Sequence, residues 1–199
     1  DLCKIISFGE DFVLLEVVEE NFNDTSLPID ITLFQGLPKS DKLELIIQKA
    51  VELGVDEIVP VEMARSVVKL DGKKSDTKTT RWQAIAESAA KQSKRNSIPK
   101  VNSVMTFKNA MEKAKETDIF IVPYESKDGM STTLSALKEI KTGMKIGVLI
   151  GPEGGFEESE VKDLLKYYNN TKKTMKGIGK RGGRLGGGAM NRMMGQFMK

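Results

Sequence analysis

The sequence predicts an α/β domain in which helices cover a mostly parallel sheet, preceded by a short β segment. From residue 29 onward, short apolar runs bounded by glycine, proline or charged residues alternate with longer segments whose apolar residues recur at helical spacing. This alternation is typical of parallel sheets, because a helix usually connects each strand to the next. The 199 residues, 39% hydrophobic and 30% charged, are enough to bury a substantial core.

Residues 1–20 contain two apolar runs separated by Gly9, Glu10 and Asp11, a pattern that predicts a β-hairpin. Two strands are marginally stable alone. We therefore expect the hairpin to be the end of a small β domain whose earlier strands are missing from this chain. Residues 21–28, "NFNDTSLP", are the expected linker, and residues 29–199 the main domain.

The main domain is expected to begin with the strand "IDITLFQGL". A helix capped by Ser40 should follow, because Leu43, Ile47 and Val51 share one helical face and Gly54 ends the pattern. Further short apolar runs predict strands at residues 55–61, 118–124 and 145–150. Helical patterns occupy residues 76–95, 106–116, 131–141 and 157–168.

Composition excludes several classes of site. The chain has no histidine and one cysteine, Cys3, so a disulfide within it, a zinc site of the usual kind and a Ser-His or Cys-His nucleophile pair are excluded. We expect no metal. The sequence has no apolar run of membrane-spanning length and no visible secretory signal, which favours a cytoplasmic protein without a membrane partner.

Positive charge is concentrated in two segments. The net charge is +6 over residues 73–100 and +8 over residues 172–199, whereas the whole chain carries only +3, so the remainder is acidic. Basic segments on an acidic protein indicate a polyanionic partner such as nucleic acid, although solvated helix faces and a tail explain the charge equally well.

The stretch "LIGPEGGF" lies where a strand ends and a helix begins, and ligands of open α/β sheets bind beyond the carboxyl ends of strands. Glycines and a proline around Glu153 indicate main chain shaped for close approach. The stretch contains neither a dinucleotide fingerprint nor a P-loop. A purely structural tight turn remains an alternative, with Glu153 as a solvated residue or a helix-dipole partner.

Two basic stretches are candidates for RNA contact. Lys39 and Lys42 lie near a helix start, where their charge opposes the helix dipole, so phosphate binding is one explanation and an ordinary surface the other. In "RWQAIAESAAKQSKRNSIP", Trp82 falls on the apolar face and is expected in the core. The polar residues of that helix can follow an RNA backbone.

Together these stretches resemble one family closely: the bacterial 16S ribosomal RNA uridine-N3 methyltransferases, the RsmE family of the SPOUT superfamily. The resemblance runs from about residue 29 to 181 and is carried by "QGLPKSDKLELIIQKAVELGVDEIVPV", "RSVVKLDGKK", "RWQAIAESAAKQSKRNSIP", "IGPEGGFEESEV" and "IGKRGGR". It implies a trefoil-knotted sheet with helices on both faces, a homodimer, and S-adenosyl-L-methionine as methyl donor. Residues 1–20 would be the end of a PUA-like β-barrel.

The resemblance also implies site residues. Three loops would surround the cofactor, namely Pro123, then Ile150, Gly151, Pro152, Gly154 and Gly155, and finally Ile178, Gly179 and Leu185. Because uridine N3 must lose a proton, we expect Arg184 to stabilise the uracil anion, Arg181 to be second in that role, and Glu153 to be a weaker candidate for the base. The expected contacts with 16S ribosomal RNA are Lys39, Arg65, Arg81, Lys91, Gln92 and Arg95.

One departure concerns the last loop. Gly179, Arg181 and Arg184 match the family pattern, but glycines occupy positions where the family has side chains, so the assignment of residues 182–199 stays open. Three alternatives to the predicted activity also stay open. They are a non-catalytic knotted RNA-binding protein, a nucleotide-binding module of unrelated chemistry, and methylation of another RNA position by the same fold.

Overall fold

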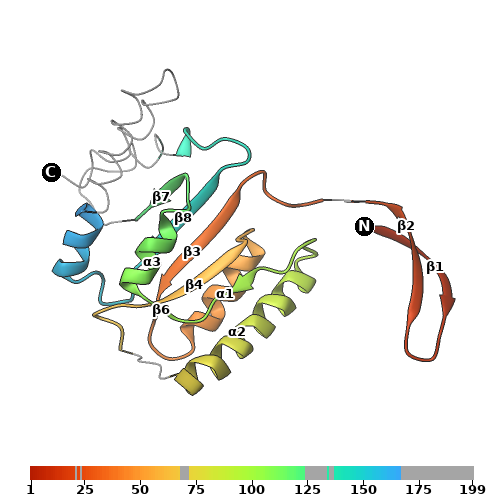
Figure 1. Ribbon diagram of the computed structural model, residues 1–199, viewed down its shortest axis with the longest axis horizontal. Helices are drawn as coiled ribbons and strands as arrows, with labels where there is room; N and C mark the ends of the chain where they lie inside the picture. The colour runs from red at the N-terminus through yellow and green to blue at the C-terminus, as the bar shows by residue number, and fades with distance from the viewer. Residues whose placement is uncertain (21, 23, 68–71, 124–133, 135–136, 167–199) are drawn as a thin grey trace.

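The structure is a computed structural model that describes residues 1–20, 22, 24–67, 72–123, 134 and 137–166. Its centre is a parallel sheet in the order β5-β4-β3-β8-β7, with β6 also paired to β4 (Figure 1). The strands are β3 (Asp30–Gly36), β4 (Glu57–Glu62), β5 (Lys100–Val101), β6 (Met105–Thr106), β7 (Ile119–Ile121) and β8 (Lys145–Ile150). The helices are α1 (Lys42–Glu52), α2 (Gly72–Gln92) and α3 (Phe107–Ala114), and residues 158–166 are also helical.

Helices cover both faces of the sheet, as expected. Neighbouring residues of β3 point to opposite faces, so Leu33 packs with α1 and α2, including Trp82, whereas Phe34 packs with α3 and with Leu164. Phe34, Ile47 and Trp82 are at most 3% exposed. The two clusters fix the strands from both sides, and the carboxyl ends of the parallel strands therefore meet at one well-defined edge.

The strands β7 and β8 and the apolar face of α1 confirm the predicted pattern, although β7 covers only 119–121 of the strand predicted at 118–124. The helix α1 begins after Asp41, with no side-chain cap, and Ser40 instead has a left-handed φ of 56°. The helix predicted at 76–95 begins at Gly72 and ends at Gln92. The strands β5 and β6 were not predicted, because each has only two residues, too few to show the alternating pattern of a strand. Most of the helix expected at 131–141 lies outside the described residues.

The hairpin is confirmed: β1 (Leu2–Phe8) pairs antiparallel with β2 (Val13–Glu19), and the turn is closed by a hydrogen bond from Gly9 N to Phe12 O. Every residue of both strands is exposed, and Figure 1 shows the hairpin standing apart from the parallel sheet. Within the described part of the chain, no helix has both the length and the apolar character that crossing a bilayer demands.

Candidate functional site

Four loops follow the ends of neighbouring parallel strands. They are residues 37–42 after β3, 63–67 after β4, 122–123 after β7 and 151–157 after β8, and we call them the carboxyl-edge site. Strand register brings them together, because Gly36 pairs with Val61 and Gln35 pairs with Ile150. This is the edge at which the sequence predicted a ligand site.

The stretch 152–155 forms a tight turn. Gly155 N donates to Pro152 O at 2.8 Å. The φ of Gly155 is +68°, a backbone conformation that residues with a side chain rarely adopt. Gly36 allows the turn to approach β3, since a Cβ at Gly36 would lie 2.7 Å from Pro152 N and 2.7 Å from Met63 Sδ. Gly36 was not among the predicted site residues, although a glycine ending a buried strand was a usable signal.

Glu153 contacts the loop before α1. Its two carboxylate oxygens each accept the N–H of Lys39 at 3.2 Å, and Lys42 Nζ lies 2.9 Å from Oε1. The hydrogen bond from Lys42, followed by those from backbone N–H groups, lowers the pKa of Glu153 to about 2. A carboxylate with that pKa is a poor proton acceptor at neutral pH, so the arrangement does not support the predicted role of Glu153 as the base.

Arg65 joins the same turn to the end of β4. Its Nη1 donates to Gly154 O at 2.9 Å and its Nε donates to Glu157 Oε2 at 2.7 Å. The buried Glu160 accepts from Ala64 N at 2.8 Å and from Glu157 N at 2.9 Å, and so caps the following helix as in a capping box. The turn therefore has polar contacts with the loops that follow both β3 and β4.

Other predicted cofactor residues lie at the same edge. Ile121 of β7 pairs with Val148 of β8, so Pro123, just after β7, and Ile150, at the end of β8, each lie two residues beyond a paired position. Both are exposed, whereas Pro152 is buried. The remaining residues of the predicted site, Ile178, Gly179, Arg181, Arg184 and Leu185, lie outside the described residues.

The predicted RNA contacts fall in two places. Lys39 and Arg65 are exposed at the carboxyl-edge site. Arg81, Lys91 and Gln92 are exposed on α2, where Arg81 pairs with Glu44 at 2.8 Å and Lys91 with Glu87 at 2.6 Å. Ion pairs this exposed contribute little to stability, so these cations can exchange their partners for phosphates.

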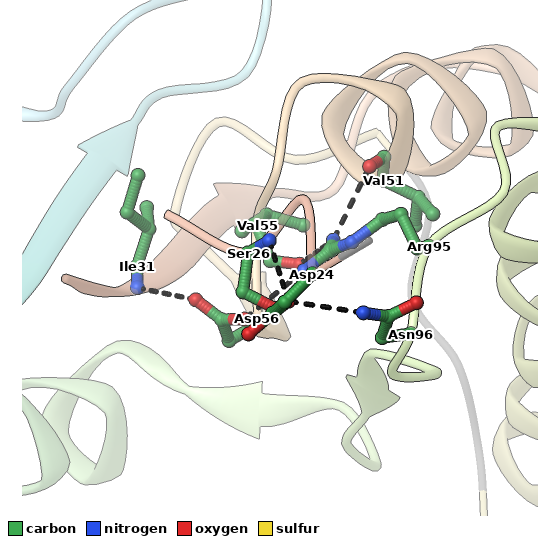
Figure 2. A network of polar contacts seen from close by, with 8 residues as sticks. All are labelled: Asp24, Ser26, Ile31, Val51, Val55, Asp56, Arg95 and Asn96. Carbon is green, nitrogen blue, oxygen red and sulfur yellow. Dashed lines mark hydrogen bonds and ion pairs between the residues drawn. The ribbon is translucent and has the colours of Figure 1, made fainter. Parts of the chain in front are cut away.

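Arg95 lies apart from this surface, and its contacts within the protein do not support the prediction that it binds RNA. Its side chain is 8% exposed and points inward, as Figure 2 shows. Nη1 donates to the carbonyl oxygens of Val51 and Val55, and Nη2 lies 3.1 Å from Asp56 Oδ1. The sequence predicted one helix over residues 76–95, which grouped Arg95 with Lys91. In the structure α2 ends at Gln92, so Arg95 lies beyond the helix and helical spacing does not apply to it.

The linker contacts the same region. Asp24 accepts hydrogen bonds from Ser26 N at 2.9 Å and from Asn96 Nδ2 at 3.1 Å (Figure 2). These bonds, those from Ser26 foremost, lower the pKa of Asp24. Among the described residues, no group of His, Cys, Asp and Glu side chains is arranged to bind a metal ion.

Known proteins have sequences similar to this chain. The sequence model of the RNA methyltransferase domain matches residues 25–174. The chain is 42% identical over 167 residues to Ribosomal RNA small subunit methyltransferase E of Bacillus subtilis, an alignment that covers 82% of this chain and 65% of that protein. It is 32% identical to the protein of the same name from Mesomycoplasma hyopneumoniae, over 76% of this chain and 63% of that one.

A relative of another kind matches a shorter segment. The Signal recognition particle 54 kDa protein of Methanobrevibacter smithii is 84% identical over 45 residues, which are 23% of this chain and 10% of that protein. The sequence identity of this match is twice that of the Bacillus subtilis match, although it covers far fewer residues. It indicates that one part of the chain resembles a different protein family.

Two solved structures share the fold. A crystal structure described as that of a hypothetical protein has 39% identity and a TM-score of 0.73, over 83% of this chain and 66% of that chain. Ribosomal RNA small subunit methyltransferase E of Neisseria gonorrhoeae, solved bound to S-adenosyl methionine, has 30% identity and a TM-score of 0.62 over the same shares. With a family model that covers most of its residues, this chain belongs to the RNA methyltransferase domain family.

Proposed function

We propose that this protein transfers a methyl group from S-adenosyl-L-methionine to N3 of a uridine in 16S ribosomal RNA. The observation that carries the proposal is the family match over residues 25–174, which includes all four loops of the carboxyl-edge site. The chain spans less than two thirds of the length of its curated methyltransferase relatives, 65% of the Bacillus subtilis protein and 63% of the Mesomycoplasma hyopneumoniae protein, so the activity of the whole protein is a proposal.

The residues at the carboxyl-edge site fit this cofactor. Pro123 and Ile150 offer exposed apolar surface suited to an adenine ring, and the glycines at 151, 154 and 155 present no side chain that would obstruct a ligand. When bound, S-adenosyl-L-methionine supplies an electrophilic methyl group on a sulfonium. The protein has to orient the uridine in line with that methyl and stabilise the uracil anion that forms as the N3 proton leaves.

Finer features of the proposal follow from the family resemblance. They are a trefoil knot formed by the C-terminal part of the chain, a homodimer, an origin of the hairpin in a PUA-like barrel, and a cytoplasmic location. Lys39, Arg65, Arg81, Lys91 and Gln92 are the proposed RNA contacts, because all five are exposed. Arg184 is proposed to stabilise the uracil anion, and Arg181 to assist it.

The 45-residue match favours a second assignment for the tail. The segments outside the family-model match, residues 1–24 and 175–199, are each shorter than 45 residues, so the match with the signal recognition particle protein overlaps the methyltransferase segment at one end. We infer that this match lies in the C-terminal part, where the sequence departs from the methyltransferase family. Residues 178–185 would then belong to a signal-recognition-particle-like segment and supply no catalytic group.

Single substitutions separate the two assignments. If Arg184 stabilises the uracil anion, Arg184→Ala slows methyl transfer by about 10²-fold or more, with S-adenosyl-L-methionine affinity nearly unchanged. If the tail has the second origin, Arg181→Ala and Arg184→Ala both leave the rate of methyl transfer at the level of the unmodified chain. Rates measured with radiolabelled donor and excess RNA decide between these outcomes.

The proposed function itself is tested by binding and by product mapping. Isothermal titration should detect S-adenosyl-L-methionine binding, and ATP should not compete. Methylation at N3 blocks base pairing, so reverse transcription of treated 16S ribosomal RNA should stop beside the modified uridine. RNA binding without cofactor uptake would instead identify a non-catalytic RNA-binding protein, and a stop at another nucleotide would identify another target position.

A further inference from the structure

We propose that Glu153 is a positioning residue, whose carboxylate fixes the turn at 152–155 against the loop before α1 and so orders the main chain that surrounds the cofactor. This inference rests on the proposed function for its effect on catalysis. The contact between the two loops can be tested independently of that function.

The geometry assigns Glu153 to contacts within the protein. Both of its oxygens face the N–H of Lys39, and Oε1 also accepts from Lys42 Nζ at 2.9 Å. One backbone N–H, that of Lys39, and the Lys42 side chain thus converge on one carboxylate, 111 to 114 residues later in the chain. These two donors hold an exposed carboxylate in one orientation against the loop after β3.

The neighbouring residues show that the turn has contacts on both sides. Arg65 donates to Gly154 O and to Glu157, which joins the turn to the end of β4, while Glu153 joins it to the loop after β3. The turn therefore lies between two anchors: Arg65 holds Gly154 O, and Glu153, next to Gly154, holds the loop after β3. Loss of the Glu153 anchor leaves the β3 side of the turn without its polar contacts.

Displacement of this turn should weaken cofactor binding. Groups that bind a ligand must be kept close to their productive geometry, and a shift of 1 Å can cost about 10²-fold in rate. We expect Glu153→Ala to weaken S-adenosyl-L-methionine binding by about tenfold, because Arg65 still contacts the turn. Glu153→Gln keeps an oxygen for the Lys39 N–H and should recover part of the affinity.

A readout besides activity comes from hydrogen exchange. The Lys39 N–H, measured by NMR in the intact protein, should exchange with solvent faster in Glu153→Ala than in the unmodified chain, by about tenfold. Glu158→Ala is the matched control, because Glu158 is an exposed acid on the next helical segment that pairs with Lys162 at 2.7 Å. That control should change neither the exchange rate nor the cofactor affinity.

The outcomes separate positioning from catalysis. A Glu153→Ala variant that binds the cofactor normally but transfers methyl 10²-fold more slowly would make Glu153 a catalytic base and overturn the inference. Unchanged Lys39 exchange would overturn it as well. If the unmodified protein does not bind S-adenosyl-L-methionine at all, the proposed function fails, while the exchange measurement still decides whether Glu153 fixes the turn.

Discussion

Arg95 donates to Asp56 with Nη2 3.1 Å from Oδ1, and this contact joins the segment after α2 to the start of β4. Arg95 Nη1 also donates to the carbonyl oxygens of Val51 and Val55, at the end of α1 and beyond it. One guanidinium thus satisfies backbone acceptors left by a helix end, and it does so beside the hydrophobic core. A residue from a basic stretch is therefore part of the scaffold rather than of the proposed RNA-binding surface.

Arg95→Ala is expected to destabilise the protein by about 1 to 3 kcal/mol, because Val55 O and Asp56 Oδ1 lose the guanidinium donor, whereas Val51 O still accepts from Gly54 N and Asp56 Oδ2 from Ile31 N. Urea unfolding at neutral pH measures this change. Lys91→Ala is the control, since Lys91 is exposed and pairs only with Glu87 in the described contacts; it should cost less than about 1 kcal/mol. Weaker RNA binding by Arg95→Ala with unaltered stability would restore Arg95 as an RNA contact.

Gly36→Ala is expected to destabilise the protein by about 1 to 3 kcal/mol, as overpacking does elsewhere. The added Cβ would lie 2.7 Å from the backbone nitrogen of Pro152, which cannot move without displacing the turn. Cofactor affinity should fall as well. Gly155→Ala provides the comparison, because its Cβ meets no atom within 4 Å and its cost, about 1 kcal/mol, comes only from the φ of +68°. Equal losses in both variants would argue against the close approach.

Lys94→Gly is expected to stabilise the protein by about 1 kcal/mol. Lys94 has a φ of 56°, and Arg95 N donates to Ala90 O at 2.9 Å, which is the hydrogen bond of a Schellman motif. Glycine adopts this conformation without the penalty that a side chain incurs. Thermal and urea unfolding should both detect the gain, while Lys91→Gly, inside α2, should lose about 1 kcal/mol. A loss in both variants would contradict the proposed cap.

Periodicity predicted most of the fold, since the strands at 30–36, 57–62 and 145–150 are buried runs and the apolar face of α1 packs as expected. The alternation of strands and helices also predicted a parallel sheet. In such a sheet the carboxyl ends of the strands meet at one edge, and this predicted the location of the carboxyl-edge site. These features depend on local pattern and on the rule that ligands bind beyond the strand ends.

The polar contacts of the site could not be predicted in this way. Glu153 meets Lys39 and Lys42 across more than 100 residues, and Arg65 meets Glu157 across 92. Neither spacing nor residue type indicates which distant charges become partners. For the same reason, the sequence placed Arg95 with the exposed cations of α2, although its position beyond the helix end turns it toward the core.

The prediction that α2 contacts RNA depends on its exposed cations Arg81 and Lys91. Replacing Arg81 and Lys91 together with alanine should reduce the slope of log affinity against log salt concentration by about 1.5, because each lost phosphate contact changes the slope by about 0.7 to 0.9. The affinity for a 16S ribosomal RNA fragment, measured at several salt concentrations, tests this. The control is Lys108→Ala with Lys115→Ala, which removes equal charge from α3 and the residue after it, on the opposite face of the sheet. An equal reduction in slope in both double variants would reflect net charge alone, whereas a reduction confined to the control would place the RNA on the α3 face.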